Sequence, residues 1–93
     1  MPDQAIETIT LHRRAATKLT ALSESERLAV ERTLLEVQRS PFDKLPLVKL
    51  KAPSYPHLYS IRASSSLRLL FVRGGSAINI LDIVDHSELP VAA

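Results

Sequence analysis

The sequence predicts an α+β fold, in which an N-terminal helical hairpin packs on one face of a small antiparallel sheet. Two stretches in the first half carry apolar residues at helical spacing, and a capping signal at Ser23 separates them. The second half, from Leu58 to Leu89, carries three short strand-like runs joined by a serine turn and a Gly-Gly pair. The predicted order is therefore strand, helix, helix and then three or four strands.

Length and composition limit the class of protein. The 93 residues predict a single domain, residues 1–93, and 45% hydrophobic content suits a small core. Disulfides and thiolate metal sites are excluded because cysteine is absent, which fits a reducing compartment. No apolar run approaches the roughly 20 residues that cross a bilayer, and the N-terminus lacks the features of a signal peptide. We therefore expect a cytoplasmic protein with no membrane association.

The first elements are a short strand and a helix. Alternation in residues 5–10 predicts the strand, although a helical start that overlaps this stretch is also compatible with the pattern. Thr10 is the expected cap of a first helix that runs from Leu11 to Ala21 or Leu22. Its apolar positions form one stripe: Leu11, Ala15, Leu19 and Leu22.

A second helix is predicted from Glu24 to about Arg39. Ser23 and Glu26 have the spacing of a capping box, and Ser40-Pro41 ends the helix. The apolar residues lie on two sides, which predicts a helix sandwiched between the first helix and the sheet. One side carries Val30, Leu34 and Val37, and the opposite side carries Leu28 and Leu35.

The basic stretch Val48–Lys51 follows a loop at residues 41–47. It alternates apolar and basic residues, which predicts a short strand or an extended arm with Val48 and Leu50 inward. A proline-bracketed loop, APSYP, precedes the strands of the second half.

Three strands are predicted at residues 57–63, 67–73 and 77–84. The Gly74-Gly75 pair predicts a tight hairpin turn between the last two. The last strand is apolar on both faces and is therefore expected to be central. Arg68, and with it Arg62, is expected on the sheet face that the helices leave open.

Charge is unevenly distributed along the chain. The net charge is only +2, but every charged residue from Lys44 to Arg73 is basic. This distribution favours an anionic ligand on one face of the sheet. The alternative is a solvated basic edge that deters aggregation between strands.

Four segments of the chain form a recognisable series: LVKLKA at 47–52, LYSIR at 58–62, LRLLFV at 67–72 and INILDIVDHSEL at 78–89. Together they resemble the RelE/ParE superfamily, the toxins of bacterial toxin–antitoxin systems. The resemblance covers nearly the whole chain in element order. It implies a β-α-α-β-β-β fold and, in the RelE-like branch, a ribosome-dependent endoribonuclease (mRNA interferase) that inhibits translation without a metal or other cofactor.

The resemblance implies roles for three residues. In this activity the 2′-hydroxyl of the mRNA attacks the adjacent phosphate, so a base, an acid and cations are needed. His86 is the candidate for general base or acid, and the alternative is a surface histidine in a terminal loop. Arg68 is the candidate for stabilising the transition state, and Arg62 either does the same or pairs with an acid.

Three further basic residues are candidates for RNA binding. Lys49 and Lys51 suit the phosphate backbone, and Arg73 completes the set. The alternative for Lys49 and Lys51 is that they are solvent-exposed lysines at the edge of the sheet with no binding role.

The end of the chain departs from the superfamily. Many active members carry an aromatic residue or further arginines after the last strand, whereas here the segment is HSELPVAA. Two alternatives therefore stay open: a ParE-like toxin that binds DNA gyrase without nuclease activity, and a degenerate, non-toxic antitoxin-binding module. All three predict an acidic cognate antitoxin as partner, beside mRNA on the ribosome or gyrase, and a homodimer is compatible with the sequence.

Overall fold

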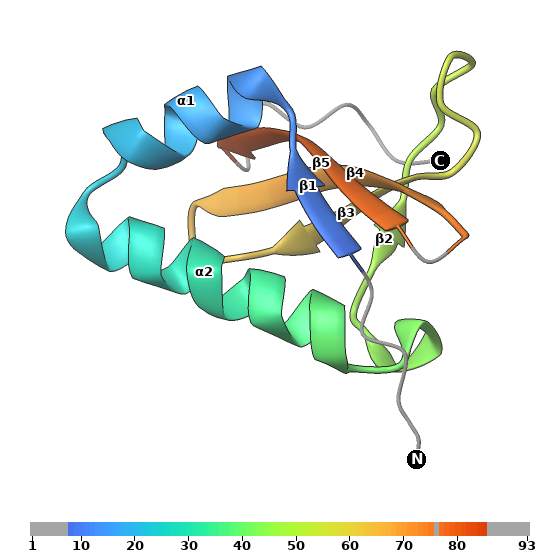
Figure 1. Cartoon of the computed structure of the whole chain (residues 1–93), viewed down its shortest axis with the longest axis horizontal. Helices are drawn as coiled ribbons and strands as arrows, with labels where there is room; N and C mark the ends of the chain where they lie inside the picture. Colours follow the sequence, from blue (N-terminus) through green and yellow to red (C-terminus); the bar gives the residue numbers. More distant parts are fainter. Residues whose placement is uncertain (1–7, 76, 86–93) are drawn as a thin grey trace.

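Two helices lie on one face of a five-stranded sheet in the computed structural model, which describes residues 8–75 and 77–85 (Figure 1). The sheet order is β1-β5-β4-β3-β2. The elements are β1 Thr8–Leu11, α1 Arg13–Ala21, α2 Glu24–Arg39, the 3-10 turn η1 Phe42–Lys44, β2 Val48–Lys49, β3 Leu58–Arg62, β4 Leu67–Gly74 and β5 Ala77–Asp85. The predicted α+β class and the helical hairpin on the sheet are confirmed.

The sheet is mixed in direction. Strands β2 to β5 form antiparallel neighbours, as predicted, but β1 pairs with β5 in parallel, from Thr8 opposite Ala77 to Leu11 opposite Ile80. Strand β5 therefore has a neighbour on each side, which agrees with its apolar character on both faces.

The core lies between the helices and one face of the sheet. The alternation of β4 directs Leu67, Leu69 and Phe71 into it, and all are at most 8% exposed. Strand β5 carries an irregularity, because Leu70 pairs with Asp82 while Phe71 pairs with Ile80. The extra residue, Leu81, shifts the alternation by one. The remaining sheet residues of this core are Ile61, Ile78, Ile80 and Ile83, and the helices add Ala15, Val30 and Val37.

The predicted start of the first helix is wrong. Helix α1 begins at Arg13, and His12 caps it by accepting a hydrogen bond at Nδ1 from the Arg14 backbone N–H, 3.1 Å away. Leu11, expected in the helix, belongs to β1. Pairing with β5 keeps this segment extended, and the His12 backbone N–H continues it by donating to the Ile80 carbonyl at 2.8 Å.

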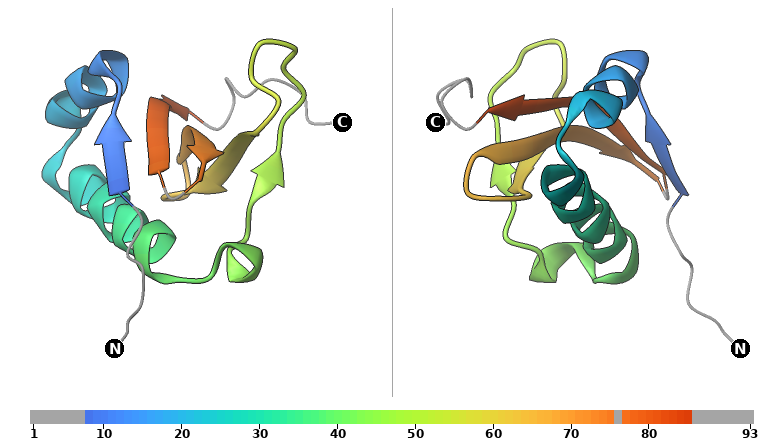
Figure 2. Two further views of the ribbon diagram at one scale, coloured as in Figure 1. Left: turned by 45° about the vertical axis from the view of Figure 1, so that its right-hand side comes forward. Right: turned by 90° about the vertical axis from the view of Figure 1, so that its left-hand side faces the viewer.

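Helix α2 has the predicted bounds and capping box, but the predicted sandwich is wrong. Ser23 Oγ accepts from the Glu26 backbone N–H at 3.3 Å, and the Glu26 carboxylate accepts from the Ser23 N–H at 3.4 Å. Leu28 and Leu35 are 50% and 48% exposed. Helix α1 packs beside α2 and against β5, so the outer side of α2 stays uncovered (Figure 2).

The edge strand and turns agree with prediction in part. Leu50 is buried, whereas Val48, expected inward, is 37% exposed because β2 is the edge of the sheet. In the serine turn, Ser64 Oγ accepts from the Leu67 N–H at 3.1 Å. Gly75 has a φ of 60°, as the predicted tight turn requires. No helix in the described ranges is long and apolar enough to cross a membrane.

Candidate functional site

Arg62 and Arg68 lie directly opposite each other on β3 and β4. Arg68 stands between Leu67 and Leu69, which both face the core, so its own side chain projects from the other face of the sheet. Arg62, opposite it, shares that face. The structure thus brings these two predicted site residues together on the sheet face opposite the hydrophobic core.

Arg68 is buried and held by a neighbour. Its residue is 7% exposed, and its Nε donates a hydrogen bond of 3.1 Å to Ser60 Oγ, which is fully buried. On the other side, Val84 of β5 lies opposite it. Arg62 is exposed at the end of β3. One guanidinium is therefore fixed, and the other faces solvent beside it.

The pair is electrostatically unfavourable by itself. Burial lowers the pKa of Arg68, and the positive charge of Arg62 lowers it further. A guanidinium nevertheless stays protonated at neutral pH. The ion pairs that join two described residues both involve Asp82, and neither includes Arg62 or Arg68. Two cations held side by side at a cost in stability form a candidate site for an anion.

His86 lies outside the described residues, so its predicted place in the site stays a prediction. The described part of β5 ends with Val84 opposite Arg68 and Asp85 opposite Leu67. The last described residues of β5 therefore lie at the same end of the sheet as Arg62 and Arg68.

Arg73 does not join the two arginines. It lies five positions further along β4 than Arg68, roughly 17 Å at about 3.4 Å per residue, and points to the opposite face. Its guanidinium carbon is 4.3 Å from the centroid of the Phe42 ring.

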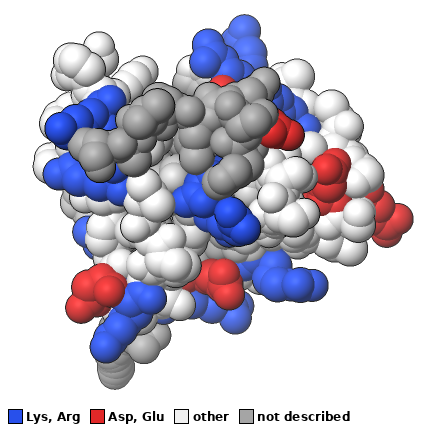
Figure 3. Space-filling view, turned by 180° about the vertical axis from the view of Figure 1, so that it is seen from behind, with Lys and Arg blue, Asp and Glu red and all other residues white. Residues whose placement is uncertain are grey.

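Lys49 and Lys51 form a third location, beside the edge strand. Both are exposed, and both border a groove of about 630 Å³ whose other lining includes Leu50 and Tyr55. Seen from behind the view of Figure 1, basic side chains likewise occur in separate groups (Figure 3).

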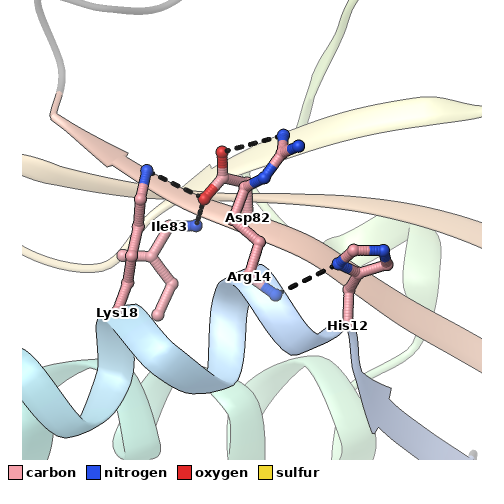
Figure 4. Close-up of polar contacts among 5 residues, drawn as sticks. All are labelled: His12, Arg14, Lys18, Asp82 and Ile83. Atoms are coloured by element: carbon pink, nitrogen blue, oxygen red, sulfur yellow. Dashed lines mark hydrogen bonds and ion pairs between the residues drawn. The ribbon is translucent and has the colours of Figure 1, made fainter.

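Sequence reasoning missed two polar features. Ser60 lies within the predicted strand at residues 57–63, and its role as the partner of Arg68 depends on the register between β3 and β4. The Asp82 carboxylate forms ion pairs with Lys18 Nζ at 3.0 Å and with Arg14 Nη1 at 3.9 Å (Figure 4). An acid inside an apolar strand was the signal for this cluster. Because it joins α1 to β5, we assign it a structural role.

The comparisons with known proteins identify the fold. No protein-family profile matches the sequence, and no curated protein matches it. Among solved structures, the chain is similar to the archaeal RelE–RelB complex from Pyrococcus horikoshii OT3, at 16% identity over 90% of this chain and 99% of that chain, with a TM-score of 0.72. It is also similar to the RelBE2 toxin–antitoxin complex from Mycobacterium tuberculosis, at 19% identity, 87% and 99% coverage and a TM-score of 0.71.

A third similar structure is the YoeB/ParE toxin from Agrobacterium tumefaciens. The identity is 14%, the coverage 85% of this chain and 98% of that chain, and the TM-score 0.70. The chain therefore has the fold of RelE, YoeB and ParE toxins, and the predicted RelE/ParE-like fold is confirmed.

Proposed function

We propose that this chain, which has the RelE/ParE fold, is the toxin of a toxin–antitoxin pair and inhibits translation by ribosome-dependent cleavage of mRNA. The observation that carries the proposal is the buried Arg68, fixed by Ser60 and placed opposite Arg62. When the nucleophile is a hydroxyl of the RNA itself, no metal is needed to generate it. What the reaction needs is fixed positive charge that stabilises the negative charge of the transition state.

In the proposed reaction the 2′-hydroxyl oxygen forms a bond to the adjacent phosphorus, and the bond from phosphorus to the 5′ oxygen breaks. The products are a 2′,3′-cyclic phosphate and a 5′-hydroxyl. Negative charge grows on the non-bridging oxygens in the transition state. Arg68 uses Nε to bind Ser60, so its two Nη groups are the ones offered to these oxygens. Arg62 adds a second cation from the same face.

Proton transfer is assigned to His86 from the sequence alone. An imidazole can remove the 2′-proton or protonate the leaving 5′ oxygen near neutral pH. Lys49 and Lys51, exposed beside the edge strand, are assigned to the RNA backbone. A cognate antitoxin is proposed as partner, because several structures with this fold are complexes of a toxin with its antitoxin.

One observation favours a second candidate function. Apart from His86, the segment HSELPVAA has no aromatic residue, and it has no lysine or arginine, so the stacking on Phe, Tyr or Trp that is worth about 1–3 kcal/mol per base would be absent there. A ParE-like toxin that binds DNA gyrase, or a non-toxic antitoxin-binding module, would not need such stacking.

Translation in a reconstituted extract, followed by mapping of the mRNA ends, tests the proposal. Cleavage at ribosome-occupied codons by the purified protein is the expected result. Intact mRNA with unimpaired translation would contradict it. In that case, a gyrase supercoiling assay and an antitoxin-binding assay would separate the two alternatives.

A further inference from the structure

Helix α2 has an apolar side that no other element covers in the described part of the chain. Leu28 and Leu35 are 50% and 48% exposed. They are seven residues apart, which is about two helical turns, so they lie on the same side of the helix. The buried residues Val30 and Val37 lie on the opposite side and face the core. The two leucines therefore belong to a surface that faces away from the sheet (Figure 2).

Opposite charges lie at the two ends of this surface. Glu24 is four residues before Leu28, and Arg39 is four residues after Leu35, so both charged side chains lie on the side of the leucines. Both are exposed, and neither takes part in the ion pairs that join two described residues. Between the leucines the surface carries one further acid and one further base. The outer face of α2 is thus made up of Glu24, Leu28, Glu31, Arg32, Leu35 and Arg39.

The order of these residues makes the outer face of α2 complementary to itself. A two-fold axis at the middle of the helix sets a second copy antiparallel to the first. Leu28 of one copy then faces Leu35 of the other, and Glu24 of one copy faces Arg39 of the other, and each contact occurs twice. The two central charged residues lie at the axis, where the copies together contribute two acids and two bases. A parallel pair would set Glu24 against Glu24 and Arg39 against Arg39, which like-charge repulsion opposes.

We propose that the outer face of α2 binds the same face of a second copy of this chain, in an antiparallel two-fold dimer. The helix has 16 residues and is therefore about 24 Å long, and a contact limited to one such helix pair belongs at the small end of protein interfaces. The dimer is accordingly weak and depends on concentration. Arg62 and Arg68 project from the sheet face opposite the core, so the dimer leaves them accessible. The inference does not rest on the proposed function, because dimerisation is measured without RNA.

Sedimentation velocity of the full-length chain measures the dimer, over roughly 5–500 μM protein and at about 50 mM salt, where ionic screening is weak. We expect the wild-type chain to change from monomer to dimer within this range. Glu24→Arg and Arg39→Glu each set like charges against each other at both ends of the interface, so each should weaken the dimer about tenfold. Arg13→Glu makes the same charge change as Arg39→Glu at an exposed position on α1, and it should keep the wild-type affinity.

A mixture of the two weakened variants is the sharper test. When one Glu24→Arg chain pairs with one Arg39→Glu chain, opposite charges again face each other at both ends of the helix pair. The equimolar mixture should therefore recover the wild-type dimer, and this recovery also shows that both variants are folded.

Single cysteines report the direction of the helix pair, because the chain has no cysteine of its own. Glu24→Cys mixed with Arg39→Cys should give a disulfide-linked dimer under mild oxidation. Neither variant alone should do so, since the two copies of position 24 lie about 22 Å apart in the antiparallel pair, too far for a disulfide.

A wild-type chain that stays monomeric over the whole concentration range would overturn the inference. So would a dimer that neither Glu24→Arg nor Arg39→Glu weakens, because such a dimer uses another surface. Cross-linking of Glu24→Cys to itself would indicate a parallel pair and would also overturn it. If the chain alone stays monomeric while Leu28→Gln removes binding of a co-expressed antitoxin, the outer face of α2 is a site for that protein instead.

Discussion

Ser60 Oγ accepts a hydrogen bond of 3.1 Å from Arg68 Nε across strands β3 and β4, and both residues are buried. The bond gives the buried serine oxygen a donor and restrains the rotation of the guanidinium. Ser60 is therefore a positioning residue for the arginine that we assign to the transition state.

Ser60→Ala tests this positioning role. Loss of the bond should lower the cleavage rate on saturating ribosomes about tenfold, with little change in KM, because the charge of Arg68 remains while its orientation is lost. Single-turnover cleavage at two ribosome concentrations separates the two constants. Ser65→Ala, in the exposed turn, is the matched control. An unchanged rate in Ser60→Ala would show that the bond has no functional role.

Arg62→Gln should weaken activity and increase stability. The variant removes a positive charge directly opposite Arg68, and relief of such a like-charge pair contributes about 0.2–1 kcal/mol to the free energy of unfolding. The lowered pKa of Arg68 means that its charged form is disfavoured in the folded state. That penalty is fully present below the folded-state pKa and is lost only as pH rises through it. The increase in the free energy of unfolding of Arg62→Gln should therefore be constant between pH 6 and 8, as measured by urea unfolding. A variant less stable than the wild-type chain would contradict the account.

His12→Ala should destabilise α1. Loss of the Nδ1 acceptor removes the helix cap, which costs about 0.5–2 kcal/mol. His12→Asn retains a capping side chain and should keep wild-type stability. Urea unfolding followed by circular dichroism measures both variants, and equal stabilities for the two would show that the cap contributes nothing.

Asp82→Asn should weaken the packing of helix α1 against strand β5. It removes the partner of Lys18 and Arg14 from a side chain that is only 14% exposed, so we expect a loss of about 1–2 kcal/mol that becomes smaller at high salt. Glu31→Gln, on the exposed side of α2, should change the free energy of unfolding by no more than about 0.5 kcal/mol. A similar loss in both variants would argue against the ion pairs.

The alternation of β4 made the core face predictable, and with it the open face that carries Arg68. The same alternation could have separated Arg73 from Arg68, because the two residues are an odd number of positions apart on one strand. The parallel direction of β1 and the extra residue Leu81 could not be predicted, since apolar periodicity does not specify which strand pairs with which.

Leu28 and Leu35 show a different limit. Their apolar character predicted a buried side of α2, but periodicity does not state what covers a surface. The site was predictable in part: Arg62 and Arg68 lie together, whereas Arg73, Lys49 and Lys51 lie elsewhere, and the role of His86 stays a prediction.

The most direct test of the central claim is single-turnover cleavage of ribosome-bound mRNA by the wild-type chain, Arg68→Gln and Arg13→Gln. The account predicts a loss on the order of 100-fold or more for Arg68→Gln, as removal of one transition-state donor gives elsewhere. It predicts a near-wild-type rate for Arg13→Gln, which loses the same charge. A folded Arg68→Gln variant that cleaves at the wild-type rate would contradict the assignment of this arginine to the reaction.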